Sequence, residues 1–374
     1  MNYVMLKDVC AINMGQSPDS KSYNDTGDGV PFFQGNADFG ARYPVTRKWC
    51  SEPTKMAAPN DILISVRAPI GAMNYARENC CIGRGLAALT PDKSKALPEF
   101  IFWLLKGKNA ELNSKGTGST FKAISRKVLE EIMIPEISLE KQMEFSEILE
   151  RVYGVIQARK EELQKLDELI KARFVELFGD PRSNPFGFEK KMLKDTCKVI
   201  TGNTPSRAIA EYYGDYIEWI KTDNIVSGIL NPTQATESLS EKGMNVGRTV
   251  EKDSILMACI AGSIASIGRV CITDRTVAFN QQINAVVPEQ YNILFLYVLL
   301  QMSKDYLVED INMALKGILS KSKLEEKEFI IPPMDLQEQF SDFVKQVNKS
   351  KVKVQKALDE TQKLFDSLMQ QYFG

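Results

Sequence analysis

Two stretches of the chain gather basic residues among glycine and serine, at equivalent places in its two halves. They are SKGTGSTFK (114–122) and LKGILSKSK (315–323). Ammonium and guanidinium groups bind phosphate oxygens, and small residues let the backbone approach a phosphate closely. The pattern predicts DNA phosphate contacts, although a solvated basic loop would look the same. The candidates in and just after these stretches are Lys115, Lys122, Arg126, Lys127, Lys316, Lys321 and Lys323.

A second group of polar residues lies in the phrases PFFQGNADF (31–39), WIKTDNI (219–225) and NQQIN (280–284), with one arginine elsewhere. In the DNA major groove, arginine pairs well with guanine, and asparagine or glutamine pairs with adenine. These residues are therefore candidates for base contacts, or, alternatively, polar residues that complete turns and strand ends. They are Gln34, Asn36, Arg84, Lys221, Asp223, Asn224, Gln281 and Gln282.

Other chemistry is excluded or unsupported by the sequence. The chain has 0 histidines, which excludes Ser-His and Cys-His nucleophiles and histidine metal helices. NPFGF (184–188) lacks the second proline of the loop that holds a flipped adenine in methyltransferases. GTGST (116–120) lacks the Gly-Lys-Ser/Thr of a phosphate-binding loop, and the carboxylates at 325–326 lack the spacing of a nuclease metal site. We expect no catalytic residue, no cofactor and no metal in this chain.

The elements that must position these residues occur twice in the sequence, as an internal repeat. MLKDVC (5–10) and MLKDTC (192–197) differ at one position and lie 187 residues apart. FIFWLL (100–105) matches FLYVLL (295–300) at an offset of 195. Internal repetition decides the fold, so it has to be recognised before anything else. The chain is therefore one unit followed by a diverged copy, and Gln281 and Gln282 fall opposite Arg84 and Gly85.

Each copy begins with a mixed region that predicts an α+β fold. Short apolar runs broken by glycine and proline indicate strands, and a longer apolar run at the end of each region indicates a helix. The strand-like runs are 61–66, 80–89, 254–262 and 277–287, the helices are 98–106 and 293–302, and 114–122 and 315–323 are expected to be loops.

Each copy ends in a long amphipathic helix. Steps of four and three residues from Phe145 and from Phe340 give mostly apolar positions, as in a heptad seam. Arg159 and Arg173 interrupt the first seam, and we expect them to face solvent or a carboxylate such as Glu162 or Glu176. The seam residues are Phe145, Leu149, Val152, Ile156, Leu163, Leu166, Ile170, Leu177, Phe340, Val344, Val347, Val354, Leu358, Phe365, Leu368 and Tyr372.

This order predicts two similar mixed domains separated by a long antiparallel two-helix coiled coil, related by a pseudo-twofold axis. The predicted segments are 1–135, 136–180, 181–333 and 334–374. The apolar seam of roughly 33 residues in each helix spans ~50 Å, which suits a DNA target with two separated half-sites. The simpler alternative is that each domain packs only its own C-terminal helix.

Composition sets the broad class. A net charge of −1 is low for a protein that binds DNA alone, so partner subunits are expected to supply part of the affinity. The 7 cysteines contain no C-x-x-C pair, which favours a reducing cytoplasm and argues against a zinc site. The longest uncharged run, Ser254–Gly268, is too short to cross a membrane.

The residues at the two domain–helix junctions carry a family resemblance. IMIPEISLEKQ (132–142) and FIIPPMDLQEQ (329–339), paired at an offset of 197, each precede a long helix, and ELFGDP ends the first helix. With WIKTDNI and PFFQGNADF, this order resembles the specificity (S, HsdS) subunit of Type I restriction-modification systems. Only the missing second proline in the first junction departs from the family pattern.

The resemblance implies that the mixed regions are target-recognition domains, each reading half of a bipartite site in double-stranded DNA. It implies that the helices space the domains and dock two methyltransferase subunits, with restriction-translocase subunits completing the complex. The chain would then be non-catalytic by itself. Two other classes remain: a pseudo-symmetric adaptor that grips two copies of a partner without touching DNA, and a nuclease with its own metal site.

Overall fold

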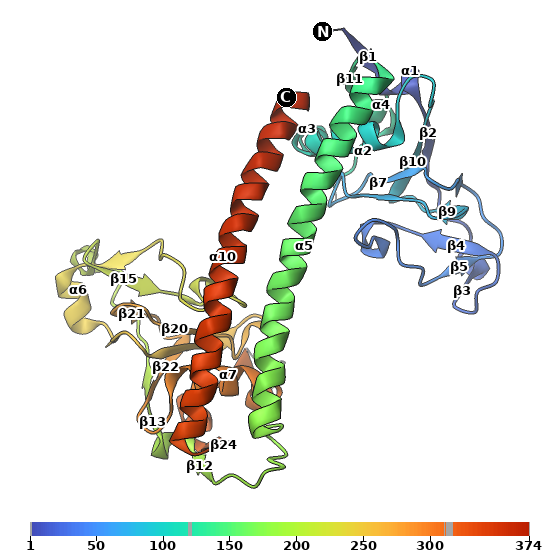
Figure 1. Ribbon diagram of the computed structural model, residues 1–374. Coiled ribbons are helices and arrows are strands. Elements are labelled where there is room, and N and C mark those ends of the chain that lie inside the picture. Colours follow the sequence, from blue (N-terminus) through green and yellow to red (C-terminus); the bar gives the residue numbers. More distant parts are fainter. Residues whose placement is uncertain (1, 119–121, 310, 312–316, 374) are drawn as a thin grey trace. The chain divides into compact units, whose positions relative to one another are not determined.

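The computed structural model describes residues 2–118, 122–309, 311 and 317–373. The chain divides into two compact units, Met1–Arg159 with Ala357–Gly374, and Lys160–Lys356. Two helices, α5 (Leu139–Phe178) and α10 (Met334–Phe373), each contribute one part to each unit (Figure 1). The segment boundaries at 135, 180 and 333 stay predictions.

The first unit contains the elements expected from its apolar runs, with additional short strands. Besides its parts of α5 and α10, these are β1 (Tyr3–Met5), α1 (Leu6–Val9), β2 (Cys10–Met14), β3 (Tyr23–Asn24), β4 (Val30–Phe33), β5 (Trp49–Cys50), β6 (Met56–Ala57), β7 (Ile62–Ser65), β8 (Met73–Tyr75), β9 (Cys80–Ile82), β10 (Leu86–Pro91), α2 (Pro98–Gly107), α3 (Asn109–Ser114), α4 (Arg126–Glu130) and β11 (Met133–Pro135).

The second unit repeats most of this list in the same order. Its elements are β12 (Lys190–Met192), β13 (Cys197–Thr201), β14 (Tyr213–Gly214), β15 (Ile217–Ile220), β16 (Ser238–Leu239), α6 (Glu241–Val246), β17 (Thr249–Val250), β18 (Ile255–Ala258), β19 (Ile260–Ala261), β20 (Val270–Ile272), β21 (Val277–Phe279), β22 (Ile283–Pro288), α7 (Ile293–Met302), α8 (Lys304–Val308), β23 (Gly317–Ile318), α9 (Lys321–Glu326) and β24 (Glu328–Ile330).

The sheets of the two units have the same strand order, which confirms the repeat in three dimensions. The first unit has sheets β2-β10-β7-β8 and β3-β5-β4-β9-β6, and the second has β13-β22-β18-β20 and β14-β16-β15-β21-β17. Each unit also has a two-stranded sheet, β1-β11 or β12-β24, and the second unit has one more, β19-β23. Within each five-stranded sheet one neighbouring pair is parallel, β4 with β9 and β15 with β21.

The alignment of Gly15 with Gly202 in the two copies has a physical cause. A Cβ on Gly15 would lie 2.1 Å from the Gly83 carbonyl oxygen, and one on Gly202 would lie 2.1 Å from that of Asn280. Both positions therefore exclude a side chain, because the backbones approach too closely. This explains why the two glycines align across the copies.

Strand pairing corrects the alignment at the junctions. Tyr3 pairs with Pro135 and Lys190 with Ile330, so β11 and β24 correspond at an offset of 195, not 197. Gln142 and Gln337 then occupy one position, and Gln339 does not. The side-chain oxygen of Gln142 accepts a hydrogen bond from the Leu97 N–H at 2.9 Å, as that of Gln337 does from Asn292. The shared proline and leucine letters suggested the wrong offset, because the strand register and the buried amide determine the equivalence.

We expect Gln337→Ala to lower the free energy of unfolding by about 1–3 kcal/mol, because it removes the partners of buried backbone groups. Gln337 is 1% exposed and its amide also donates to the Pro332 carbonyl at 2.8 Å. Chemical denaturation, followed by a spectroscopic signal from the second unit, measures the change in the free energy of unfolding. Gln339→Ala is the matched control, since Gln339 is exposed, and an equal loss in both variants would contradict the corrected alignment.

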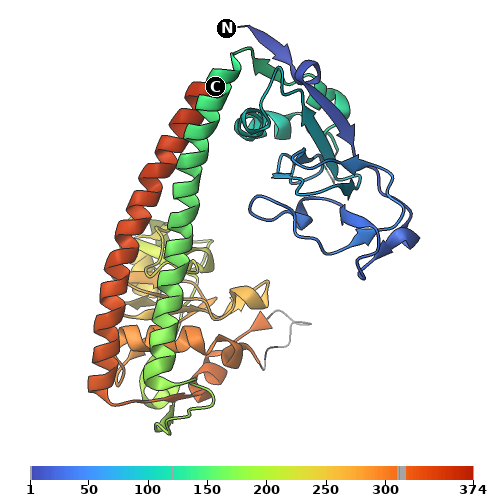
Figure 2. The same cartoon turned by 45° about the vertical axis from the view of Figure 1, so that its right-hand side comes forward.

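In the first unit, the end of α10 packs beside the start of α5 (Figure 2). The rings of Phe145 and Tyr372 stack with centroids 3.9 Å apart, and Phe373 lies 5.6 Å from Phe100 of α2. In the second unit, the end of α5 packs beside the start of α10, where Phe174 lies 5.6 Å from Phe340. Each unit thus holds one end of each helix in antiparallel order, so the alternative in which a domain packs only its own helix is wrong.

The predicted seam residues are all buried or half-buried. Arg173 pairs with Glu176 at 2.8 Å, as expected. The expectation for Arg159 is wrong, because its guanidinium donates to the Ala357 carbonyl and the Thr361 hydroxyl of α10. The second predicted loop is also partly wrong, because α9 begins at Lys321, with Ser320 accepting from the Lys323 N–H at 3.3 Å as its N-cap.

Candidate nucleic-acid interface

The parallel strands β4 and β9 bring two of the predicted base-contact segments together. Both strands end at the same edge of the sheet, and the segments 34–38 and 83–85 follow them. A Cβ on Gly83 would lie 3.1 Å from the Gln34 Cα, so the two segments touch. Gln34 and Arg84 are exposed there, and Asn36 is half-buried.

The second unit has the same arrangement at the ends of β15 and β21. Asn280 donates its N–H to the Ile220 carbonyl at 3.0 Å, which places 280–282 beside 221–224. Asp223 and Gln281 are exposed, and the Gln281 side chain accepts a hydrogen bond from the Thr204 hydroxyl. The side chain of Gln282 is half-buried and accepts from the Asn280 amide at 3.2 Å.

Lys221 is more constrained than the sequence suggested. Its ammonium pairs with Glu237 and lies 5.2 Å from the centroid of the Trp219 ring. Glu237 also pairs with Arg207 at 2.6 Å, and the two cations lower the pKa of this carboxyl through their hydrogen bonds. Lys221 is therefore held in place rather than freely mobile.

Asn224, predicted as a base contact, uses its side chain within the protein. Asn224 is 7% exposed, and its side-chain oxygen accepts the Lys221 N–H at 3.0 Å. Its amide donates to the Gln234 carbonyl at 3.1 Å. Through these hydrogen bonds the Asn224 side chain closes a turn. Asp38 closes the equivalent turn in the first unit, where its carboxylate accepts a hydrogen bond from the Gln34 N–H at 2.7 Å. An Asx residue that closes a turn gives the same sequence signal as one that reads a base.

The basic candidates lie on short helices or beside them, and several of them form ion pairs at the solvent-exposed surface. Lys115 pairs with Glu111 at 2.6 Å, Arg126 with Glu130 at 2.7 Å, Lys127 with Glu131 at 3.7 Å and Lys321 with Glu325 at 3.4 Å. Lys122 and Lys323 are exposed, and Lys316 lies outside the described residues. Exposed pairs of this kind contribute little, so these cations can turn to a phosphate.

One backbone segment in each unit joins the two groups of candidates. In the first unit, the Val66 N–H donates to the Gly85 carbonyl at 2.9 Å and the Ala68 N–H to that of Lys122 at 3.0 Å. In the second, the Cys259 N–H donates to Gln282 at 2.8 Å, and the Leu319 N–H donates to Cys259 at 2.8 Å. Each unit therefore has a continuous polar edge, which comprises 34–38, 83–85 and 122–127 in the first and 221–224, 280–282 and 317–323 in the second.

Sequence reasoning missed two arginines near these edges. Arg67 is exposed at the joining segment, and in the described part of the chain no carboxylate pairs with it. Arg207 lies 4.4 Å from the Tyr213 ring centroid and 5.2 Å from that of Trp219. An offset of 187 aligns Arg207 with Ser20, so a search for diverged positions would have found it. Arg67 gives no comparable signal.

Among the residues that the structure describes, no cluster of three or more histidine, cysteine or acidic residues could hold a metal. The cysteines are free and buried, and burial raises the pKa of the Cys10 and Cys197 thiols to about 12. These two thiols are core residues. Over the same described ranges, no helix combines the length and the apolar character needed to cross a bilayer.

The chain matches the model of a known protein family over most of its length. The family described as Type I restriction modification DNA specificity domain matches residues 1–168 and 185–361. The chain belongs to this family. Type I specificity subunits are non-catalytic members of their systems, and the family model matches this chain twice, once in each copy of the repeat.

Individual Type I specificity subunits are similar over part or all of the chain. The putative MjaX specificity subunit of Methanocaldococcus jannaschii is 42% identical over 42% of this chain and 37% of that protein. The MjaIX specificity subunit of the same organism is 25% identical over 97% of this chain and 90% of that protein.

Two solved structures share the fold. The crystal structure of the Type I S subunit from M. genitalium superposes with a TM-score of 0.62 at 14% identity, covering 100% of this chain and 96% of that one. A structure from work on complex assembly and conformational transition of a Type I system gives 0.57 at 17% identity, covering 100% and 97%. These similarities support two domains joined by a coiled coil.

Proposed function

We propose that this specificity subunit reads a bipartite, gapped sequence in double-stranded DNA, with one recognition domain on each half-site. The observation that supports this most is the matched polar edge, where one backbone segment links exposed arginine or amide side chains to a basic segment in both units. Base contacts specify a sequence and phosphate contacts hold the protein in register. Both kinds of contact are available from one edge.

The long helices are proposed to set the gap and to dock two methyltransferase subunits, with restriction-translocase subunits joining them. The seam residues are used within the chain, so a partner would meet the apolar residues that stay exposed on α5 and α10. Apolar side chains that stay exposed on these helices are available for contact with a partner. They are Leu139, Met143, Val155, Leu169, Val175, Met334, Val352 and Leu364.

Residues that differ at matched places in the two polar edges would make the two DNA half-sites differ in sequence. Arg84 corresponds to Gln281, and arginine prefers guanine where glutamine prefers adenine. We expect Arg84→Gln to change or relax one base of one half-site, with a discrimination change of about 1–3 kcal/mol, and to leave the other half-site unaltered. Selection of bound sequences from a random duplex pool, using the chain with its methyltransferase subunits, measures this. Lys93→Gln, an exposed lysine at the other end of β10, is the control.

The salt dependence of DNA binding distinguishes the second candidate function, a protein adaptor that does not touch DNA. Neutralising DNA phosphates releases counterions, so the logarithm of the association constant falls steeply as the logarithm of salt concentration rises. The complex is expected to show this slope, measured by fluorescence anisotropy with labelled duplex. A partner-bound complex with no measurable duplex affinity at low salt would favour the adaptor instead.

A further inference from the structure

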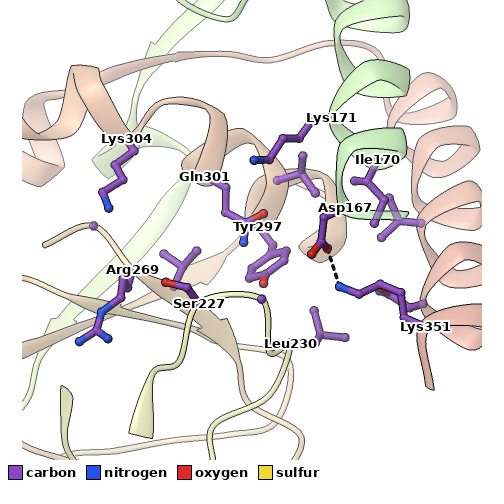
Figure 3. Close-up of a pocket in the computed structure, with 16 residues that line it drawn as sticks. Asp167, Ile170, Lys171, Ser227, Leu230, Arg269, Tyr297, Gln301, Lys304 and Lys351 are labelled. Atoms are coloured by element: carbon purple, nitrogen blue, oxygen red, sulfur yellow. Dashed lines mark hydrogen bonds and ion pairs between the residues drawn. The ribbon is translucent and has the colours of Figure 1, made fainter. Parts of the chain in front are cut away.

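The second unit contains a cavity of about 250 Å³ between α5, α7, α10 and the segment 227–230. Figure 3 shows Tyr297 amid the labelled side chains, with Lys171 and Asp167 from α5, Lys351 from α10, and Ser227 and Leu230 from the loop. Every residue that lines the cavity belongs to the second unit.

The same place in the first unit is occupied by an arginine. The Arg42 carbonyl accepts the Tyr75 N–H at 3.0 Å, as the Leu230 carbonyl accepts the Ile272 N–H at 2.8 Å, so Leu230 takes the place of Arg42. The Arg42 guanidinium extends inward and pairs with Glu150 at 2.8 Å. A leucine is too short to do this.

Two more exchanges enlarge the space. At the offset of 195, Val298 and Asn348, which line the cavity, correspond to Trp103 and Tyr153. In the first unit these two rings contact each other, with centroids 5.3 Å apart. Three large side chains are thus replaced by small ones, and protein interiors rarely leave such space unfilled without a reason.

The cations at this place differ between the two units: the first unit has Arg42, and Lys106 opposite Gln301, whereas the second has four others. The cavity of the second unit is lined by Lys171, Arg269, Lys304 and Lys351 and by one carboxylate, Asp167, which pairs with Lys351 at 2.5 Å. Lys304 donates to the Ala265 carbonyl at 2.6 Å and Arg269 to that of Thr222 at 3.1 Å, whereas Lys171 has no ion pair among the described residues. The corresponding first-unit residues, none of them cationic, are Asp366, Ala72, Asn109 and Ile156.

We propose that this cavity binds a small phosphate ester. A concave site whose lining carries a net positive charge concentrates anions, and Lys171, Arg269 and Lys304 offer donors suited to phosphate oxygens. The volume corresponds to roughly eight water molecules, which leaves room for a polar body beside the phosphate. Ser227, Gln301 and Asn348 line the cavity and can hydrogen-bond hydroxyl groups of a sugar. The proposal does not depend on DNA reading.

Isothermal titration calorimetry of the full chain with ribose 5-phosphate, at constant ionic strength, tests the proposal. Wild type is expected to bind one equivalent. Lys171→Gln should weaken binding at least about tenfold through loss of a charged hydrogen bond. Asn348→Tyr restores the first-unit side chain and should abolish binding while thermal unfolding shows an intact fold. Lys252→Gln, an exposed lysine outside the cavity, should bind like wild type.

Three results would overturn the proposal. They are no saturable binding to wild type, equal binding by wild type and Asn348→Tyr, and binding of inorganic phosphate as tight as that of ribose 5-phosphate. The DNA affinity of Lys171→Gln in the assembled complex provides a separate arm. It should match wild type, and a tenfold loss there would assign the cavity to a DNA phosphate instead. Ribose 5-phosphate binding stays measurable even if the chain does not read DNA.

Discussion

Phe178→Ala is expected to lower the free energy of unfolding of the second unit by about 3–5 kcal/mol, the usual cost of a buried Phe→Ala change. Phe178 is 0% exposed at the end of α5. Its ring lies 4.7 Å from Phe295 of α7 and 5.5 Å from Phe340 of α10, in edge-to-face contact with both. The residue therefore joins both long helices and the mixed region of this unit in one core, and truncation leaves a cavity among aromatic rings.

Chemical denaturation followed by tryptophan fluorescence measures this loss, with Trp219 reporting on the second unit and Trp49 and Trp103 on the first. Phe186→Ala is the matched control, because Phe186 is 57% exposed in the segment after α5. We expect it to change stability by no more than about 0.5 kcal/mol. Similar losses in the two variants would show that the ends of α5 and α10 are not packed as described.

Replacing Lys122, Arg126 and Lys127 together by glutamine is expected to weaken DNA binding of the assembled complex roughly hundredfold at ~0.15 M salt. Each lost phosphate contact should lower the steepness of the salt dependence by about one, so the triple variant should lose about three. The three side chains are exposed on one edge of the first unit. Affinity measured at several salt concentrations gives both quantities.

The control removes the same charge from the other end of the same sheet. Lys7, Lys93 and Lys95 are exposed and lie near the Cys10–Pro91 end of the β2–β10 pair, whereas the polar edge lies beyond its Met14–Ala87 end. The triple glutamine variant of these lysines should bind DNA as wild type does. If both triple variants lose affinity equally, the effect is one of net charge and the polar edge is not the contact surface.

The repeat made much of this fold predictable from sequence. Sustained heptads place α5 and α10, and the apolar run at 293–302 becomes α7 with the same bounds, because long periodic segments depend little on distant contacts. The two-residue strands such as β5 and β16 gave no usable pattern. Their pairing is set by neighbouring strands, which a local reading of the sequence does not contain.

The polar edges were predicted less completely than the fold. Matched glycine-rich and polar phrases located the turns, but not the role of each side chain. Asn224 closes its turn while Gln281 stays exposed, and both are amides in similar phrases. Burial and hydrogen-bond partners distinguish them, and these depend on which strands lie next to one another. The parallel pairs β4–β9 and β15–β21, which create the edges, join segments that are far apart in sequence.

The central claim is that each recognition domain reads one half-site and the helices set the gap between them. Insertion of seven residues into each long helix, after Arg159 and after Lys356, keeps the heptad phase and tests this claim directly. Sequences selected from a random duplex pool by the assembled complex are then compared with those of wild type. We predict the same two half-sites separated by a longer unread gap. Altered half-sites, or one continuous recognition sequence in either protein, would contradict the account.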